Sequence, residues 1–271
     1  MMRTALSALA ALSLLTTAHA RQQPSLDVPF MVGERLTYDV KFGPIKVGSG
    51  SMEVSALDTV RDQTAWHVTF RVKGGTFFYR VNDVMESWID TTNFASLRFR
   101  QQLEEGGKER LRDYLIFPER AEYTENGGDP LPSVDLPLDD ASFLYFVRSL
   151  PLTIGETYEF HRYFKPDRNP VRITVVGREM VSVPAGTFST ILIKPVIKTK
   201  GIFSGDGEAR IWLSDDDRRV MVQLKSSLSF GSLNLYLTSV VRPDPFAPPV
   251  PPSGSGAAAT APSLTQPPAG R

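Results

Sequence analysis

Acidic side chains and two histidines are the residues of this sequence whose types are suited to chemistry. The densest group is Asp215, Asp216 and Asp217, and such a run of carboxylates can bind a hard cation such as calcium. The run lacks the internal glycine and the distal glutamate of a calcium-binding loop, so a solvated turn is the favoured interpretation. We therefore predict no metal site here.

Glu34 and Glu156 form a second candidate, because two carboxylates lying roughly 5–10 Å apart can act together on a glycosidic bond. Sequence supplies no such distance, and both residues are better explained as outward-facing residues at the start of strands. His67 and His161 fall in expected strands, where a histidine that faces solvent or a polar groove is the ordinary interpretation. The alternative is a cell-wall or glycan-acting enzyme that uses Glu34, Glu156, His161 or the Asp215 cluster.

Motifs of the common enzyme classes are absent. The chain contains no cysteine, which excludes disulfides, thiolate catalysis and cysteine ligands for zinc. It has neither a His-Glu-x-x-His pair nor a Gly-x-Ser-x-Gly nucleophile elbow, and its glycines do not fall in a strand-to-helix phosphate loop. We predict no catalytic residue, no cofactor and a protein that is not an enzyme.

Aromatic residues in glycine-rich loops favour a binding function instead. The candidate ligand-binding residues are Phe77, Phe78, Tyr79, Phe203, Trp88 and Trp212. Loops carry functional residues more often than the framework does, and aromatic loops at one rim would line an apolar mouth. The alternative is that these loops fold back and cap the core. The expected partner is an apolar or lipid-like ligand, or a protein of the cell envelope.

The elements that must position these residues are β-strands joined by tight turns. In residues 209–237 apolar and polar residues alternate on both sides of an aspartate-rich corner, which is typical of a β-hairpin. A similar corner with Trp88 and Asp90 lies in residues 87–99, and a Pro-Ala-Gly turn before Thr187 should place Gly186 in the left-handed region. Residues 126–137 are expected to form a proline-rich connection. Strands are expected at residues 34–42, 47–57, 63–73, 82–90, 97–103, 111–117, 157–164, 171–183, 187–199, 209–213, 220–228 and 232–240.

One main helix is expected near residues 139–150. Asp139 and Asp140 suit its first turn, because carboxylates are favoured at a helix N-terminus. Apolar residues then follow at helical spacing for about three turns, and Pro151 ends the pattern. The wide apolar face predicts that this helix packs on a sheet or plugs the open end of a barrel.

Together these patterns predict an all-β fold with minor α content, either an antiparallel barrel or a strongly curved half-barrel. One β-rich domain is expected over residues 30–241, possibly made of related halves at 30–138 and 152–241. Gly33-Glu34 in the first half matches Gly155-Glu156 in the second, and Trp88 matches Trp212. The alternative is chance, because β-meanders often reuse such corners.

Both ends of the chain are expected outside this domain. Residues 1–20 combine a positive start, an apolar run and an Ala-His-Ala site, which is typical of a secretory signal peptide cut before Arg21. Residues 21–29 are expected to be a linker, and residues 242–271, rich in Pro, Ala, Ser and Gly, a disordered tail. Without a cysteine the protein is not expected to be a lipoprotein, and no later stretch is apolar enough to cross a membrane. We expect a soluble periplasmic or secreted protein.

Charge composition bears on the partner. Basic and acidic residues are balanced at 30 each, and no lysine or arginine run forms a basic stripe. Nucleic acid is therefore not an expected partner.

Four ordered motifs resemble a known family. They occupy residues 30–38, 140–152, 183–188 and 211–216. The family-motif residues of interest are Gly33, Glu34, Ser142, Tyr145, Arg148, Trp212, Asp215 and Asp216, together with Gly155 and Glu156, which repeat the Gly-Glu pair of the first motif. Together they resemble the bacterial exported domain-of-unknown-function family 3108, over about residues 30–240. This resemblance implies an exported, β-rich protein without an agreed activity. More distantly, the plan is similar to the curved antiparallel sheets of periplasmic lipoprotein-localisation carriers.

We therefore predict an exported, non-catalytic binding module that carries an apolar ligand or assists envelope assembly, with its ligand or partner between sheet and helix. A glycan-acting enzyme is one alternative. The other is a structural module whose edge strands or tail recruit a partner protein.

Overall fold

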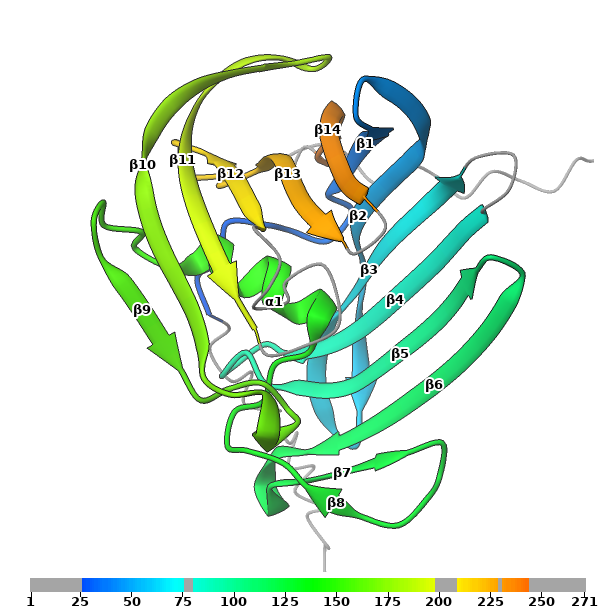
Figure 1. Cartoon of the computed structure of the whole chain (residues 1–271). Coiled ribbons are helices and arrows are strands. Elements are labelled where there is room, and N and C mark those ends of the chain that lie inside the picture. Colours follow the sequence, from blue (N-terminus) through cyan, green and yellow to red (C-terminus); the bar gives the residue numbers. More distant parts are fainter. Residues whose placement is uncertain (1–25, 76–79, 198–208, 229–230, 244–271) are drawn as a thin grey trace, which may run out of the picture.

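The computed structural model describes residues 26–75, 80–197, 209–228 and 231–243. Fourteen strands form one antiparallel sheet that curves around a short helix (Figure 1). The strands are β1 (Arg35–Phe42), β2 (Ile45–Val60), β3 (Gln63–Gly75), β4 (Arg80–Asp90), β5 (Ser96–Glu105), β6 (Lys108–Phe117), β7 (Glu122–Glu125), β8 (Leu131–Pro132), β9 (Thr157–Phe160), β10 (Val171–Val183), β11 (Gly186–Val196), β12 (Arg210–Ser214), β13 (Met221–Leu228) and β14 (Gly231–Val241).

The strand order shows two meanders joined at one seam. Strands β1 to β8 pair in sequence, strands β9 to β14 do the same, and the antiparallel pairing of β1 with β14 connects the two runs. Strands β8 and β9 are the two edges of the sheet, so the sheet is not closed. The predicted antiparallel β fold is confirmed, in its half-barrel form.

The predicted helix is present and sits inside the curve of the sheet. Helix α1 (Asp140–Phe146) continues into a 3-10 turn, η2 (Val147–Ser149). Asp139 is its N-cap, and the side chains of Asp139 and Ser142 form a capping box with each other's backbone N–H groups. The α-helical part is shorter than the three turns expected, because the last turn tightens to 3-10 geometry before Pro151. Two further 3-10 turns are η1 (Pro118–Arg120) and η3 (Pro166–Arg168).

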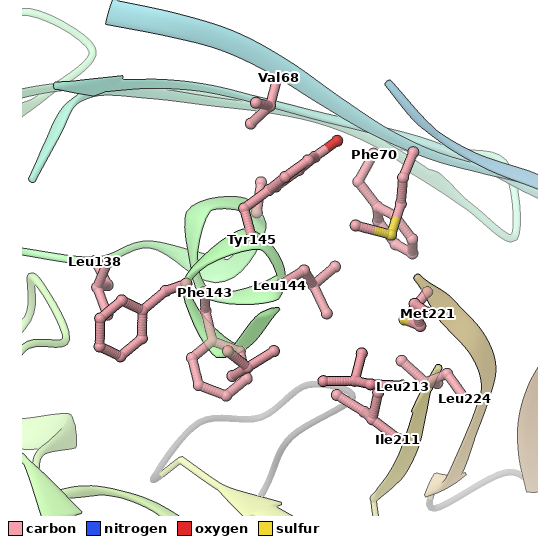
Figure 2. Packing of buried hydrophobic residues seen from close by; sticks show 14 of the residues in the cluster. Val68, Phe70, Leu138, Phe143, Leu144, Tyr145, Ile211, Leu213, Met221 and Leu224 are labelled. Atoms are coloured by element: carbon pink, nitrogen blue, oxygen red, sulfur yellow. The ribbon is translucent and has the colours of Figure 1, made fainter. Parts of the chain in front are cut away.

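Helix α1 packs against both meanders (Figure 2). All residues from Ala141 to Phe146 are buried. Tyr145 points towards Val68 of β3, whereas Leu144 points towards Leu213 and Met221 of the second meander. The helix therefore provides the centre of a single apolar core instead of covering one side of it.

Several turns have the predicted chemistry. The β10–β11 hairpin closes through Val183 and Gly186, and Gly186 has a φ of +133°, as predicted. At the end of β4, a carboxylate oxygen of Asp90 accepts the backbone N–H of Thr92 at 2.6 Å. The aspartate corner between β12 and β13 is also a turn. Short polar side chains thus define the hairpins by bonding the local backbone.

The two Gly-Glu turns have the same backbone hydrogen bonds. The N–H of Gly33 donates to Val54 at 2.7 Å and the N–H of Gly155 donates to Val175 at 2.9 Å. The φ angles of the two glycines are +83° and +85°, which is a left-handed conformation that glycine adopts without strain. This correspondence supports our proposal that the two halves of the domain are related.

Two parts of the secondary structure differ from the expectation. Strand β7 lies just before the expected 126–137 connection, and strand β8 lies within it. The short pairing between them was not predicted, because proline argues against a strand except at the edge of a sheet. Strand β9 ends at Phe160, so the expected strand to residue 164 is wrong and His161 lies outside it. Tyr163 and Phe164 are consecutive and both buried, which ends the alternation of a strand.

Candidate functional site

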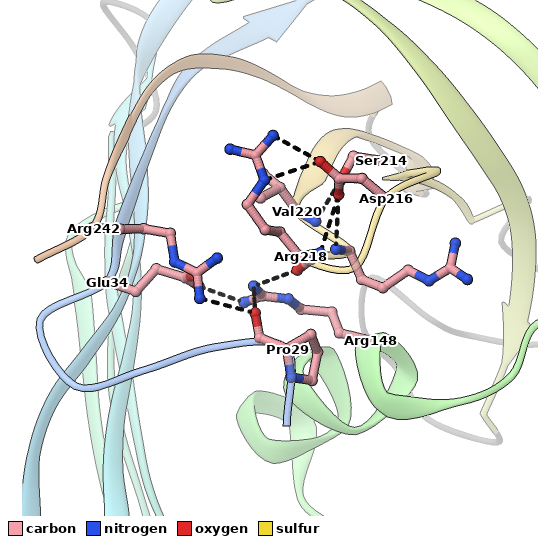
Figure 3. A network of polar contacts seen from close by, with 9 residues as sticks. Pro29, Glu34, Arg148, Ser214, Asp216, Arg218, Val220 and Arg242 are labelled. Carbon is pink, nitrogen blue, oxygen red and sulfur yellow. Dashed lines mark hydrogen bonds and ion pairs between the residues drawn. The ribbon is translucent and has the colours of Figure 1, made fainter. Parts of the chain in front are cut away.

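A buried ion pair lies at the centre of the family-motif residues (Figure 3). Arg148, from η2 after α1, places Nη1 2.7 Å from Oε1 of Glu34, which immediately precedes β1. The side chains are 0% and 1% exposed, respectively. Glu34 was expected to face outward, and that expectation is wrong, because the turn at Gly33 directs the carboxylate inward. Glu156 is exposed, as expected.

A second guanidinium completes this group, which we call the buried clasp: Glu34, Arg148 and Arg242. Nε of Arg242 lies 3.3 Å from Oε2 of Glu34. The same residue donates from Nη2 to the backbone oxygen of Pro29 at 3.4 Å. Arg242 falls in the segment predicted as a disordered tail, yet this contact makes it part of the fold. The clasp ties both ends of the domain to the helix.

The clasp also reaches the aspartate corner between β12 and β13. Nη2 of Arg148 donates to the backbone oxygen of Arg218 at 3.1 Å. Asp216 holds that corner in shape by accepting the backbone N–H groups of Arg218 and Arg219, each at 3.2 Å. Three motifs that are far apart in sequence therefore meet at Arg148 (Figure 3).

Aromatic rings surround the clasp and exclude water from it. The guanidinium carbon of Arg148 lies 5.5 Å from the ring centroid of Phe30 and 5.7 Å from that of Tyr145. Phe30 and Tyr145 pack edge to face at 5.1 Å. Burial raises the pKa of both the Tyr145 and the Tyr38 hydroxyl above the usual value, so both remain neutral.

These contacts suit a structural role better than catalysis. Both carboxylate oxygens of Glu34 lie against guanidinium groups, Oε1 against Arg148 and Oε2 against Arg242, so the carboxylate is engaged in holding the fold together. Asp215 is engaged as well, with Nε of Arg178 at 2.6 Å. His67 lies between Asp58 at 3.4 Å and Glu86 at 3.3 Å, and His161 is exposed. Glu34 and Asp215 are thus engaged in ion pairs, and His67 lies beside two carboxylates.

The N-terminus of α1 carries a second buried polar group. Oδ2 of Asp139 accepts the hydroxyl of Ser87 at 2.6 Å, and Oδ1 accepts the backbone N–H groups of Ala141 and Ser142 at 2.8 Å each. The hydroxyl of Ser96 reaches Ser142 at 2.9 Å. These bonds fix the start of the helix to β4 and β5. Burial nevertheless dominates and raises the pKa of Asp139 to about 6.

This shift predicts a pH dependence of stability. The folded-state pKa of Asp139, about 6, exceeds the ordinary value of 3.8, so the folded protein binds the proton more tightly than the unfolded chain. The stabilisation is complete below about pH 4 and is lost as pH rises through about 6. Relative to Asp139→Asn, the wild-type free energy of unfolding should fall by about 2–3 kcal/mol between about pH 4 and pH 7.5. Urea unfolding of both proteins across this range measures the difference, and parallel pH profiles would contradict it.

Trp88 and Trp212 lie on the outer face of the sheet, away from α1. The residues on either side of each tryptophan are buried on the helix side. Both indole N–H groups donate to carboxylates, Trp88 to Asp58 at 2.8 Å and Trp212 to Glu179. A cation lies over each ring, from Arg98 and Lys225. The interior therefore does not contain these two predicted binding residues.

One end of the central strands carries exposed apolar side chains at a hairpin tip. Phe42 and Ile45, which face each other across the β1–β2 turn, are 45% and 65% exposed. We call these two residues the apolar rim. Strands β1, β3, β11 and β13 all run towards this end of the sheet, so β3 and β11, which precede residues 76–79 and 198–208 in the sequence, both end there. The predicted binding residues Phe77, Phe78, Tyr79 and Phe203 belong to those segments and lie outside the described residues.

Sequence reasoning missed three contributors to these polar groups, Arg242, Ser87 and Ser96. Arg242 immediately precedes a proline-rich stretch, so in the sequence it looks like the first residue of the tail. Ser87 and Ser96 lie in strands, and the residue type alone does not show whether a serine in a strand faces the core or the solvent. The signal that could have identified Ser87 is strand parity, since it shares a face with the buried Ile89.

Within residues 26–75, 80–197, 209–228 and 231–243, no three histidine or acidic side chains are grouped so that they could hold a metal ion. Over the same ranges, none of the helices has the length and apolar character needed to cross a bilayer.

Comparison with known proteins places this architecture among proteins without assigned activity. A family model described as a protein of unknown function (DUF3108) matches residues 37–238. No curated protein matches the chain. A beta-barrel-like protein of domain of unknown function DUF1849 from Brucella abortus is 12% identical, with a TM-score of 0.50 over 80% of this chain and 100% of that one. A predicted exported protein with a YmcC-like fold from Bacteroides fragilis is 13% identical, with a TM-score of 0.29 over 81% and 100%.

Proposed function

The chain belongs to the DUF3108 family of proteins of unknown function, and from this premise we propose that it is an exported, non-catalytic carrier or envelope-assembly factor that binds an apolar ligand or partner. The signal-peptide pattern of residues 1–20 supports export to the periplasm or beyond. The contacts of Glu34, Asp215 and His67 with neighbouring charged side chains support a role other than catalysis for these three residues.

The observation that carries the proposal is the apolar rim. Ile45 is 65% exposed and Phe42 45% exposed, and the two residues are paired at the tip of one hairpin, so their apolar side chains are exposed at the same place. Strands β3 and β11 end at this same end of the sheet, immediately before the segments that contain Phe77, Phe78, Tyr79 and Phe203 in the sequence.

The packing of helix α1 favours the apolar rim over the space between sheet and helix as the binding surface. Its buried side chains pack against both meanders, so the protein's own residues occupy the centre of the curve. A ligand there would have to displace Leu144 or Tyr145 from a close-packed core. We therefore relocate the predicted binding surface from the sheet–helix interface to the rim.

A direct test uses the neutral apolar dye 1-N-phenylnaphthylamine with the full mature chain. The double variant Phe42→Ser/Ile45→Ser should weaken dye binding at least tenfold, because burying such side chains contributes about 1.5–3 kcal/mol each. Leu57→Ser is the matched control, since Leu57 is 55% exposed on β2 but lies towards the opposite end of that strand. Mass spectrometry of an organic extract would identify any lipid that copurifies with the wild type.

The dye-binding test can support or contradict the proposal. Loss of dye binding in the rim variant, with the control unchanged, supports the proposal. Equal dye affinity in all three proteins, or no measurable binding to the wild type, would sink it.

A further inference from the structure

The two edges of the open sheet are unequally protected. Strand β8 consists of Leu131–Pro132, and such a short strand with a proline offers little backbone for further pairing. The other edge is formed by β9, which covers only the first part of β10 (Figure 1). Strand β10 then continues along the sheet without a neighbour on that side.

The uncovered part of β10 comprises residues 176–183, which we call the open edge. Pairing with β9 ends at Thr174, and Val175 makes the last backbone bonds on that side, to Gly155 and Glu156. On the other side, β11 pairs with β10 as far as Val183. No described strand bonds the open edge from outside, so alternate N–H and C=O groups along it face away from the sheet.

Apolar side chains accompany this unpaired backbone. Val176 is 44% exposed and Met180 is 67% exposed, both on the open edge. Ile154, 42% exposed, precedes Gly155, whose N–H bonds the oxygen of Val175 at the start of the open edge. Main-chain bonding groups together with apolar contacts at intervals are what an added β-strand requires.

The charges that usually protect an edge are engaged elsewhere. Arg178 is paired with Asp215 at 2.6 Å, and Glu179 accepts the indole N–H of Trp212. No lysine lies on residues 176–183, and the first proline follows Val183. The open edge therefore lacks the free charge and proline that discourage strand addition in other proteins.

We propose that residues 176–183 bind an extended, uncharged peptide segment with apolar residues at alternate positions, by addition of a β-strand to β10. Arg178 and Glu179 of the open edge already have partners within the protein, so neither is free to pair with a charged peptide. An uncharged peptide is therefore favoured over an acidic or basic one. A second copy of this chain is a poorer occupant. A strand of this length spans only about 26 Å, and its pairing alone would bury less than the roughly 1,200 Å² typical of stable protein–protein interfaces.

The test uses a fluorescein-labelled peptide, Thr-Val-Thr-Val-Thr-Val-Thr, and the full mature chain. Fluorescence anisotropy should show saturable binding to the wild type and at least tenfold weaker binding to Met180→Lys. Amide hydrogen exchange in residues 176–183 should slow when the peptide is present. A peptide with N-methyl groups on alternate residues lacks the required donors and should lose at least tenfold in affinity.

Leu111→Lys is the matched control, because Leu111 is 55% exposed on β6, far along the sheet from β10. It should bind the peptide like the wild type. Equal binding of the N-methylated peptide, or equal binding by Met180→Lys with an unchanged melting temperature, would overturn the proposal. A dimer in sedimentation that Met180→Lys dissolves would also overturn it, by identifying a second copy as the occupant.

Discussion

Replacing Arg148 with methionine is expected to lower the free energy of unfolding by about 3–5 kcal/mol. The substitution leaves the Glu34 carboxylate buried, 1% exposed, with only the more distant Arg242 to compensate it. It also removes the bond to the backbone oxygen of Arg218 at the aspartate corner. Urea denaturation monitored by tryptophan fluorescence measures the loss.

The matched control removes the charge on both sides. In Glu34→Leu/Arg148→Met no unpaired carboxylate remains, and Arg242, 24% exposed, can turn to solvent. The double variant should recover most of the lost stability, since well-packed apolar replacements of buried ion pairs are often neutral. A single variant within about 1 kcal/mol of the wild type would show that the clasp is not the structural centre we describe.

Adding one methyl group at Gly48 is expected to cost about 3 kcal/mol or more. A Cβ at this position would lie 2.1 Å from the backbone oxygen of Lys73 and 2.5 Å from the Cα of Gly74. Gly48 and Gly74 face each other across β2 and β3, so neither can carry a side chain unless the backbones separate. Gly48→Ala should therefore lower the melting temperature sharply, as measured by circular dichroism.

Gly177→Ala provides the comparison for this steric effect. A Cβ there meets nothing within 4 Å, and Gly177 does not have a positive φ. The substitution should be neutral or stabilise slightly by restricting the unfolded chain. If Gly48→Ala and Gly177→Ala have the same melting temperature, the close approach of β2 and β3 is not rigid.

Local chemistry made most of the fold predictable from sequence. Residues 171–183 alternate and are followed by Pro-Ala-Gly, and strand β10 has those bounds. Asp139 and Asp140 marked the start of the helix correctly. Such features succeed because hairpins and helix caps depend on residues that are close in sequence. The two-residue strand β8 could not be found this way, because its pairing depends on β7 and not on its own composition.

The site was less accessible to sequence reasoning, for a different physical reason. Glu34 is an ordinary polar residue at the start of a strand until Arg148 and Arg242 approach it from distant parts of the chain. Whether a carboxylate faces solvent or a buried guanidinium depends on tertiary contacts that no local pattern records. The shared Gly-Glu pattern correctly predicted two similar turns. It did not indicate that the two glutamates differ in burial, Glu34 being buried and Glu156 exposed.

The joined ends of the domain also determine how it can be presented. Pro243 lies so close to Gly33 that a Cβ on the glycine would approach the proline ring to 2.5 Å. Arg35 pairs with Val241 at the end of β1 that is opposite to Phe42. A segment fused directly at either described end of the domain would therefore begin at the end of β1 opposite to the β1–β2 turn, about one strand length from Phe42 and Ile45.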